Sequence, residues 1–347
     1  MTTARTNHQV RLAKRPETTA TREHWNFTTE PVADPSDGGV LVQTLSLSLD
    51  PAMRGWLNDA KSYIPPVAIG EVMRAGGVGR VLASKNPAFA VGDTVYGTLS
   101  VQEYALLPQE AIQRAGLVKI DLGMGTVGQW LNVLGMPGMT GYFGLLDIGQ
   151  PQPGQTVVVS AAAGAVGQTV GQLAKIKGCR AVGIAGGQAK CDWVVRELGF
   201  DACIDYKAGP GAVLEGLKQH CPKGVDVYFD NVGGEILDHV LAKLARKARV
   251  IVCGAISQYN NANSMPGAGP RNYLSLLVNR ARMEGMVVFD YADRFPQAIT
   301  ELAGYLKDGR MQSKEDVVQG LDSFPETLNK LFAGGNFGKL VLQVAAA

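Results

Sequence analysis

The distribution of apolar residues changes about halfway along the chain. Between about Val40 and Leu107, apolar residues fall into short runs separated by turn residues, a pattern typical of β-strands. We expect strands at Val40–Leu47, Gly77–Ala83, Asp93–Gly97 and Gln102–Leu107. Helical periodicity is nearly absent here, which predicts a small β-rich domain.

After Pro153-Gly154, apolar runs alternate regularly with helical patterns. The run Thr156–Ser160 is followed by Ala165–Lys177, in which apolar residues recur at helical spacing. Further strands are expected at Arg180–Ile184, Ala202–Tyr206, Val225–Asp230, Arg249–Cys253 and Met283–Phe289, and further helices at Lys190–Leu198, Ala212–His220 and Glu235–Leu244. Six strands with helical crossovers predict an α/β protein with a doubly wound parallel-sheet Rossmann domain.

The length of the chain suits two domains. It has 347 residues, and a typical domain has roughly 150. The tail from Val317 to Val344 returns to a mixed strand and helix pattern, so we expect it to close back onto the first domain. The expected division is residues 1–133 with 317–347 for the β-rich domain, and residues 134–316 for the Rossmann domain.

Charge and composition exclude several classes of protein. Lys and Arg number 33 against 31 Asp and Glu, so there is no basic excess for a nucleic acid. No uninterrupted apolar run approaches the ~18 residues of a membrane span. The five cysteines are odd in number and form no CxxC pair, which supports neither a disulfide framework nor a zinc ribbon. We expect a soluble, cytoplasmic protein with no nucleic-acid or membrane partner.

A run of small residues joins the first strand of the alternation to its first helix. It reads Ser160-Ala-Ala-Ala-Gly164-Ala-Val-Gly167, with Ala162 at the first glycine position of the usual dinucleotide pattern. Such a run lets the backbone approach a pyrophosphate at a helix N-terminus. An alanine-rich turn can also be an ordinary strand–helix junction, but its place at the start of six strands favours a dinucleotide site.

The end of the second strand bears on the choice of dinucleotide. NAD sites usually place an acid there for the ribose 2′-hydroxyl, whereas this chain reads Ile184-Ala-Gly-Gly-Gln-Ala-Lys190. The two glycines leave room for a 2′-phosphate, and Lys190 offers a cation. The alternative is that Lys190 is a solvated lysine at a helix start. The missing acid favours NADPH.

Four segments of the chain resemble one known family. Gly135–Phe143, Ser160–Gly167, Tyr228–Gly234 and Cys253–Asn260 are similar to the signatures of prostaglandin/leukotriene B4 reductases. These are zinc-independent medium-chain dehydrogenases/reductases, related to plant alkenal reductases and bacterial curcumin-reductase-like enzymes. Further similar segments lie at Leu49–Gly55, Ile69–Gly79 and Asn336–Lys339, so the resemblance spans nearly the whole chain. It implies a GroES-like first domain, a Rossmann domain and NADPH-dependent reduction of activated carbon–carbon double bonds.

The resemblance also implies a set of cofactor-binding residues. These are Gly164, Ala165, Val166 and Gly167 at the pyrophosphate, Lys190 at the 2′-phosphate, Tyr206 and Asn231 along the cofactor channel, Cys253, Gly254, Ala255, Ile256, Ser257 and Tyr259 beside the nicotinamide, Met286, Val287 and Val288 in a second such segment, and Asn336 from the tail. Two positions depart from the family pattern. Ala52 replaces a usual aromatic residue, which bears on substrate size, and Trp193 replaces a tyrosine.

The sequence offers no plausible set of zinc ligands. Zinc-dependent relatives carry a Gly-His-Glu segment, whereas this chain reads Ile69-Gly-Glu-Val72. The four histidines, at positions 8, 24, 220 and 239, have no ligand spacing. We therefore expect no metal. Without a Lewis acid to stabilise an alkoxide, hydride transfer to an already electrophilic carbon is favoured over alcohol oxidation.

Tyr259 is the candidate catalytic residue. Reduction of an enone or enal places hydride on the β-carbon, and the resulting enolate oxygen needs a hydrogen-bond donor before the α-carbon is protonated. Tyr259 follows a buried strand at the side of the sheet where ligands bind, although a loop tyrosine can also serve packing alone, and a cofactor ribose hydroxyl can share the role.

The sequence leaves two other functions open, and it also bears on the oligomeric state. A zinc-free quinone reductase of the zeta-crystallin type and a non-catalytic NADPH-binding protein are the alternatives. Gln258-Tyr-Asn260 and Met136-Pro137 favour the enone/enal reductase. The last Rossmann strand offers an edge that is usually paired or covered, so we expect a homodimer.

Overall fold

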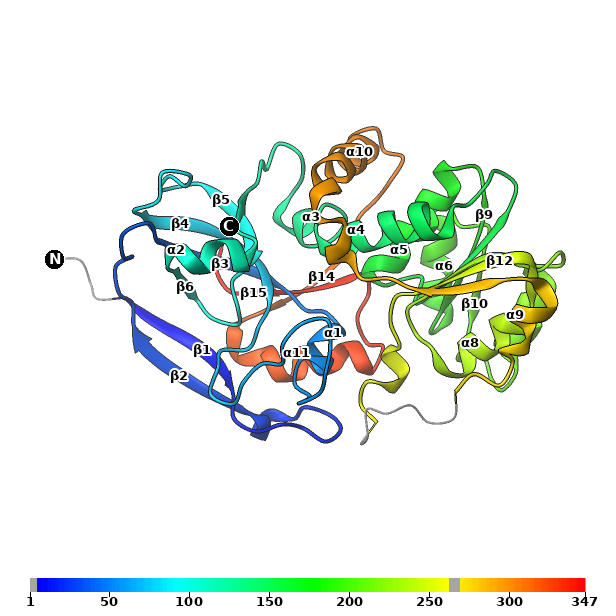
Figure 1. Cartoon of the computed structure of the whole chain (residues 1–347), viewed down its shortest axis with the longest axis horizontal. Coiled ribbons are helices and arrows are strands. Elements are labelled where there is room, and N and C mark those ends of the chain that lie inside the picture. Colours follow the sequence, from blue (N-terminus) through cyan, green and yellow to red (C-terminus); the bar gives the residue numbers. More distant parts are fainter. Residues whose placement is uncertain (1–4, 262–268, 347) are drawn as a thin grey trace. The chain divides into compact units, whose positions relative to one another are not determined.

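The computed structural model describes residues 5–261 and 269–346. The chain divides into two compact units, which Figure 1 shows in sequence colours. One unit runs up to Leu131 and resumes at Glu315, and the other comprises Asn132–Lys314. Each unit has its own sheet, so each is described in turn.

The second unit is built on a six-stranded parallel sheet with the order β10-β9-β8-β11-β12-β13. Its strands are β8 (Thr156–Ser160), β9 (Arg180–Ala185), β10 (Ala202–Asp205), β11 (Val225–Asp230), β12 (Leu244–Val252) and β13 (Arg282–Gly285). The strand order reverses between β8 and β11, and sheets of this type bind ligands at the carboxyl ends of the strands beside such a reversal. The predicted doubly wound Rossmann sheet is confirmed.

Helices lie on both sides of this sheet (Figure 1). They are α4 (Met136–Phe143), the π-helical segment η2 (Gly144–Gly149), α5 (Ala165–Ile176), α6 (Gln188–Arg196), α7 (Ala212–His220), α8 (Gly234–Leu241), η3 (Ile256–Gln258), α9 (Leu274–Asn279), η4 (Val288–Arg294) and α10 (Phe295–Lys307). Val158, Val182, Tyr228 and Val250, one from each of four strands, are fully buried between strands and helices. The apolar runs of the sequence therefore form the core of this unit.

Three element boundaries of this unit differ from the sequence prediction by three residues or more. The strand expected to begin at Arg249 already begins at Leu244. The helix expected to reach Leu244 ends at Leu241, because Leu244 already pairs with Val225 at the start of β12. The strand expected over Met283–Phe289 ends at Gly285, since its partner β12 ends at the opposite residue, Val252. The chain after this point turns into the 3₁₀ helix η4.

The first unit contains a seven-stranded sheet, in which six strands follow the order β14-β15-β3-β4-β5-β7 and the seventh, β6, pairs with β3. Its strands are β1 (Thr6–Leu12), β2 (Trp25–Pro31), β3 (Val40–Ser48), β4 (Gly76–Ser84), β5 (Thr94–Thr98), β6 (Tyr104–Leu107), β7 (Val118–Lys119), β14 (Glu315–Gln319) and β15 (Lys339–Gln343). Its helices are η1 (Arg22–His24), α1 (Ala52–Gly55), α2 (Gln109–Ala115), α3 (Val127–Leu131), η5 (Leu321–Ser323) and α11 (Phe324–Phe332). Because β15 pairs with β3 and Phe324 and Leu328 are fully buried, the tail completes this unit.

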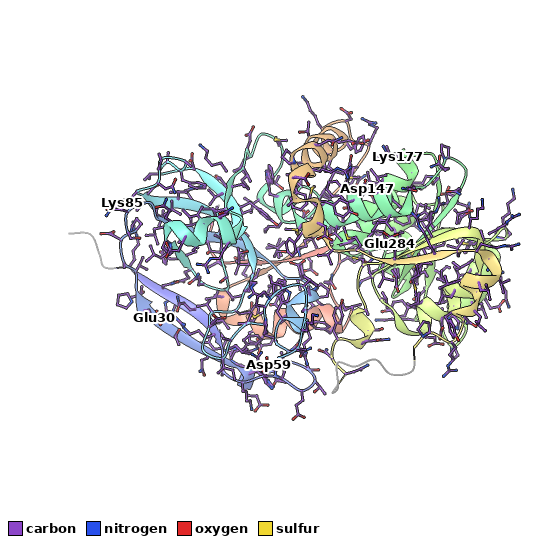
Figure 2. The ribbon with its side chains drawn as sticks, viewed as in Figure 1. Glu30, Asp59, Lys85, Asp147, Lys177 and Glu284 are labelled. Atoms are coloured by element: carbon purple, nitrogen blue, oxygen red, sulfur yellow. The ribbon has the colours of Figure 1, made fainter. Side chains whose placement is uncertain are left out.

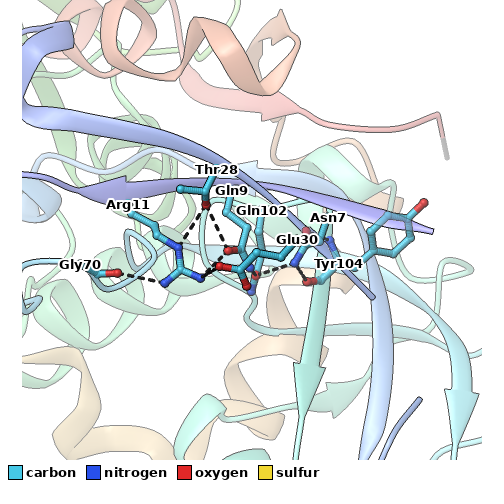
Figure 3. A network of polar contacts seen from close by, with 8 residues as sticks. All are labelled: Asn7, Gln9, Arg11, Thr28, Glu30, Gly70, Gln102 and Tyr104. Carbon is cyan, nitrogen blue, oxygen red and sulfur yellow. Dashed lines mark hydrogen bonds and ion pairs between the residues drawn. The ribbon is translucent and has the colours of Figure 1, made fainter. Parts of the chain in front are cut away.

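A polar network attaches the β1–β2 hairpin to the rest of the first unit (Figure 3). The Asn7 side chain donates to the Gln102 Oε1 and Tyr104 carbonyl oxygens at 3.1 and 2.8 Å, and the Tyr104 N–H donates back to Asn7 Oδ1 at 2.9 Å. Arg11 donates to the Gly70 carbonyl at 2.9 Å. Since Asn7 is only 8% exposed, these bonds satisfy polar groups that would otherwise be buried without partners.

Candidate active site

A buried carboxylate lies at the reversal of strand order between β8 and β11. Asp230 Oδ1 accepts hydrogen bonds from the Tyr228 hydroxyl at 2.8 Å and the Ser160 hydroxyl at 3.2 Å. The same oxygen accepts the N–H groups of Val232 and Gly233 at 3.0 and 2.9 Å. Burial raises the pKa of Asp230, and these four donors oppose the rise. Asp230 thus fixes the end of β8, where the small-residue loop begins, to the turn after β11.

The segment that carries Tyr259 is attached to the same turn. The Asp230 carbonyl accepts the N–H groups of Cys253 and Gly254 at 2.9 and 3.1 Å. The Val232 carbonyl accepts the Ser257 N–H at 3.3 Å and the Ser257 hydroxyl at 2.6 Å. The predicted nicotinamide segment therefore lies at the carboxyl end of β11.

The Tyr259 hydroxyl lies over its own loop. Its oxygen accepts the Ala255 N–H at 3.0 Å, and a Cβ at Gly254 would come within 3.0 Å of it. A phenolic oxygen that accepts a hydrogen bond has its own O–H polarised, which strengthens that O–H as a donor. The contact therefore holds the Tyr259 ring at this edge of the sheet.

The small-residue loop forms a close cradle at the start of α5. Gly164 is the residue before the helix, and Ala161 takes a positive φ of 51°. A Cβ at Gly167 would lie 2.2 Å from the Ala161 carbonyl oxygen, so a side chain does not fit there. Gly164, Ala165 and Val166, which directly precede Gly167, are partly exposed. The exposed loop and the N-terminus of the 12-residue helix fit a pyrophosphate.

The segment expected to bind the 2′-phosphate opens α6. Gly187 precedes the helix with a φ of 95°, and Lys190 lies in the first turn, partly exposed. The Gly187 N–H donates to Asp205 Oδ1 at 2.7 Å. Asp205 is an acid that the sequence analysis missed, because it ends the third strand of the alternation and not the second. By accepting the Gly187 N–H, the Asp205 carboxylate fixes the turn that precedes Lys190.

A cavity of about 260 Å³ opens beside this segment. Its walls include Tyr206, Pro210, Ile236 and His239. Tyr206 is 39% exposed, and a Cβ at Gly186 would lie 2.7 Å from its hydroxyl oxygen, so the ring sits directly against the start of α6. Glu235 also lines this cavity, so its walls combine one aromatic ring with apolar and polar side chains. That Tyr206 lies along the cofactor channel stays a prediction.

The remaining predicted residues fall into two groups. The Asn231 side chain donates to the Ser160 carbonyl at 2.8 Å, and the Met286 N–H donates to the Val252 carbonyl at 3.1 Å, so both belong to the carboxyl edge of the sheet. Val287 and Val288 follow Met286 there, and Ile256 lies with Ser257 in η3. Asn336 belongs to the first unit, where its side chain donates to the Gly338 carbonyl at 2.8 Å.

Comparison with known proteins shows which class of protein this fold and site define. Residues 8–115 match the family described as the N-terminal domain of oxidoreductase, and residues 165–304 match the family described as zinc-binding dehydrogenase. The NADPH-dependent curcumin reductase of Escherichia coli is 43% identical over 98% of this chain and 97% of its own. The NADP⁺-dependent 2-alkenal reductase of Nicotiana tabacum is 40% identical over 88% and 87%. The chain is thus an oxidoreductase by class.

A solved structure agrees with these relatives. The crystal structure of CurA from Vibrio vulnificus in complex with NADPH is similar to this chain with a TM-score of 0.89, at 42% identity over 98% of this chain and 100% of the other. The chain belongs to the zinc-independent medium-chain dehydrogenase/reductase family. The resemblance carried by the sequence motifs is thereby confirmed.

The described residues do not fit the zinc ion that one of the matched families is named for. Across residues 5–261 and 269–346, no three His, Cys, Asp or Glu side chains gather closely enough to hold a metal. Burial, with the nearby Asp230 charge, raises the pKa of Cys253 to about 12, so this thiol stays neutral and is a poor ligand. No step of the reaction below is derived through a metal.

Activity is expected to survive exhaustive chelation, because the described donor set does not match a catalytic zinc site. The measurement is turnover before and after dialysis against a strong chelator, with metal analysis of the same samples. Loss of activity that returns on adding zinc would contradict this expectation.

Proposed function

We propose that this protein uses NADPH to reduce the carbon–carbon double bond of α,β-unsaturated ketones and aldehydes. The observation that carries the proposal is the attachment of the Tyr259 segment to the turn after β11, which Asp230 also joins to the start of the small-residue loop. A donor and a pyrophosphate cradle thus share one edge of the sheet. The relatives named for curcumin and 2-alkenal reduction support the same conclusion.

Each part of the site has a role in this reaction. NADPH, when bound, supplies the hydride that adds to the β-carbon of the substrate. The cradle at Gly164 and Gly167 holds the pyrophosphate, and Lys190 pairs with the 2′-phosphate. The Tyr259 O–H donates to the carbonyl oxygen as negative charge develops there, and a proton then reaches the α-carbon.

The first unit is proposed to be the GroES-like substrate domain. Its short helix α1 begins at Ala52, where the family usually has an aromatic residue. Arg54 of this helix is 1% exposed and donates to the carbonyls of Thr18 and Pro16 at 2.8 and 3.1 Å. Arg54 fixes the position of this helix. The space that the small Ala52 side chain leaves, compared with an aromatic residue, therefore supports a site for a bulkier substrate.

A panel of substrates separates this function from its alternatives. We expect NADPH oxidation with enones and enals, and none with allylic alcohols under the same conditions. Rapid turnover of quinones without turnover of enones would identify a quinone reductase. Tight NADPH binding with no turnover of any class would identify a non-catalytic binding protein.

Lys190→Ala is expected to raise KM for NADPH by about 10- to 100-fold and to leave KM for NADH nearly unchanged. The reason is that one charge-assisted contact to the 2′-phosphate contributes about 1.5–3 kcal/mol. Lys175→Ala is the matched control, because Lys175 pairs with Asp201 at 2.9 Å at the far end of α5. Equal use of NADH and NADPH by the wild type would contradict the proposed role of Lys190.

We also propose a homodimer formed through the exposed edge of the Rossmann sheet. All four residues of β13 are exposed, including Glu284, which Figure 2 labels. On the neighbouring α9, Leu277 and Val278 are 76% and 66% exposed. An open strand edge beside exposed apolar side chains is typical of a surface that a second copy covers.

The double variant Leu277→Glu with Val278→Glu is therefore expected to be monomeric. Four charges brought together across a two-fold interface repel each other and lose the apolar contact. Sedimentation velocity at micromolar concentration measures the result, and Val91→Glu, at a 67% exposed position of the first unit, is the control. A monomeric wild type, or a dimeric double variant, would contradict the proposed interface.

We propose a cytoplasmic location, because the cysteines of this protein form no disulfide bonds. All five cysteines are free, as is usual where glutathione and thioredoxin keep thiols reduced. Among the described residues, no helix is long and apolar enough to cross a membrane. Cell fractionation with antibody detection tests the location.

A further inference from the structure

We propose that Gln168 and Gln172, two residues of the helix α5, are positioning residues for hydride transfer. Their side chains bind the main chain of residues 312–314, the segment through which the chain leaves the Rossmann unit before β14 begins at Glu315. The inference rests on the proposed function, in which the Rossmann unit holds NADPH and the first unit binds the substrate.

Each glutamine amide forms a reciprocal pair of hydrogen bonds with one main-chain residue. Gln172 Nε2 donates to the Gln312 carbonyl at 3.0 Å, and the Gln312 N–H donates to Gln172 Oε1 at 2.7 Å. Gln168 repeats this pattern on Lys314, with distances of 3.3 and 2.9 Å. Gln168 is 0% exposed and Gln172 is 3% exposed, so bulk water does not replace these bonds when they break.

The spacing of the four residues fixes the register of this segment. Residues four apart on a helix lie about 6 Å apart along its axis, and residues two apart on an extended chain lie about 6.6 Å apart. Gln168 and Gln172 therefore pair with Gln312 and Lys314 in the way that a neighbouring antiparallel strand would. A slip of one residue would turn the N–H and carbonyl groups of the segment away from α5, because successive residues of an extended chain point these groups to opposite sides.

The other crossing between the two units is attached to the same segment. Asn132 is the first residue of the Rossmann unit and is 0% exposed. Its side chain donates to the Ser313 hydroxyl at 2.9 Å and to the Lys314 carbonyl at 3.4 Å. The two ends of the Rossmann unit are thus held together, and Gln168 and Gln172 attach them to α5.

The same helix carries the proposed pyrophosphate cradle. Gly164 precedes α5, and its carbonyl accepts the Gln168 N–H at 3.0 Å, so Gln168 lies at the first turn. Hydride transfer requires the reacting atoms to lie about 3–3.5 Å apart, and a misplacement of about 1 Å can lower the rate about 100-fold. Releasing residues 312–314 from α5 frees the point from which the first unit continues and leaves the cradle intact. We therefore expect the chemical step to be impaired and NADPH binding to be retained.

Gln172→Met tests the inference, because methionine has a similar length and no amide. We expect the rate of hydride transfer to fall about tenfold or more, and the Kd for NADPH to stay within about twofold of the wild-type value. Stopped-flow absorbance of NADPH in a single turnover with an enone measures the rate, and fluorescence titration measures the Kd. NADPH deuterated at the transferred position should slow the observed step, which identifies that step as hydride transfer.

Gln9→Met is the matched control for lost stability. Gln9 is 7% exposed, and its side chain donates to Gln102 Oε1 at 2.9 Å in the first-unit network of Figure 3. Both variants remove a buried amide, so both should lower the Tm. At a temperature well below either Tm, Gln9→Met should keep the wild-type rate of hydride transfer. A purely structural role of Gln172 would give the same result for Gln172→Met.

Gln168→Met is a second, milder perturbation that decides the question if Gln172→Met does not fold. One of the two bonds that it removes is 3.3 Å long, and it should also slow hydride transfer at an unchanged Kd. A folded variant that transfers hydride at the wild-type rate, or that loses NADPH affinity in place of the rate, would overturn the inference. Failure of the proposed function gives a different result, a wild-type protein that oxidises NADPH with no enone, and the inference then falls with it.

Discussion

Replacing Gly167 by valine is expected to raise the Kd for NADPH more than about 100-fold. A Cβ at this position already lies 2.2 Å from the Ala161 carbonyl oxygen and 2.8 Å from the Ala162 Cα, so both obstacles are backbone atoms. The loop must open to admit the side chain, and a loop that moves away from the helix N-terminus loses its contacts to the pyrophosphate. A hundredfold loss corresponds to about 2.8 kcal/mol.

The measurement is a fluorescence titration with NADPH, with a thermal melt of the same samples. Gly304→Val is the control, because a Cβ at Gly304 in α10 would meet no atom within 4 Å. Gly167→Ala gives a second, smaller perturbation if the valine variant does not fold. A folded Gly167→Val protein with wild-type affinity would remove the loop from the cofactor site.

Tyr259→Phe is expected to lower kcat about tenfold or more and to leave KM for NADPH nearly unchanged. The phenolic O–H acts only as charge develops on the enolate oxygen, so its loss affects the transition state and not cofactor binding. A dedicated oxyanion donor typically contributes 10²–10³ in rate, and we expect less because a ribose hydroxyl can share the role. Steady-state kinetics on an enone measures the effect.

The Tyr259 variant also loses the acceptor for the Ala255 N–H, so a modest fall in Tm is expected alongside. Tyr305→Phe separates the two effects. Tyr305 is 8% exposed in α10, and its hydroxyl donates to Glu301, so this variant should lose stability and keep its kcat. If kcat for Tyr259→Phe stays at the wild-type value, the tyrosine serves packing and the enolate oxygen has another donor.

The fold of the second unit could be predicted because a short continuous stretch of sequence indicates each of its strands and helices. Each strand is an apolar run and each crossover a helical pattern, so the parallel sheet follows from chain order. The predicted helix end at Leu244 was wrong because it depends on a contact between residues distant in sequence. An apolar residue near Leu241 continues a helical pattern, and only its pairing with Val225, a contact distant in sequence, makes it a strand residue.

The candidate site likewise combines features that continuous motifs indicate with features that depend on contacts between residues distant in sequence. The small-residue loop and the Tyr259 segment could be found from continuous motifs, although their roles stay predictions. Asp230 lies within a third motif, Tyr228–Gly234, but its function depends on Ser160, which is 70 residues away in sequence.

The most direct test of the proposed function follows the hydride itself. The protein is incubated with an enone and NADPH carrying deuterium at the transferable position of the nicotinamide, and the product is examined by NMR. The proposed function predicts a saturated ketone with deuterium on the former β-carbon. An allylic alcohol with deuterium on the former carbonyl carbon, or a recovered enone, would contradict it.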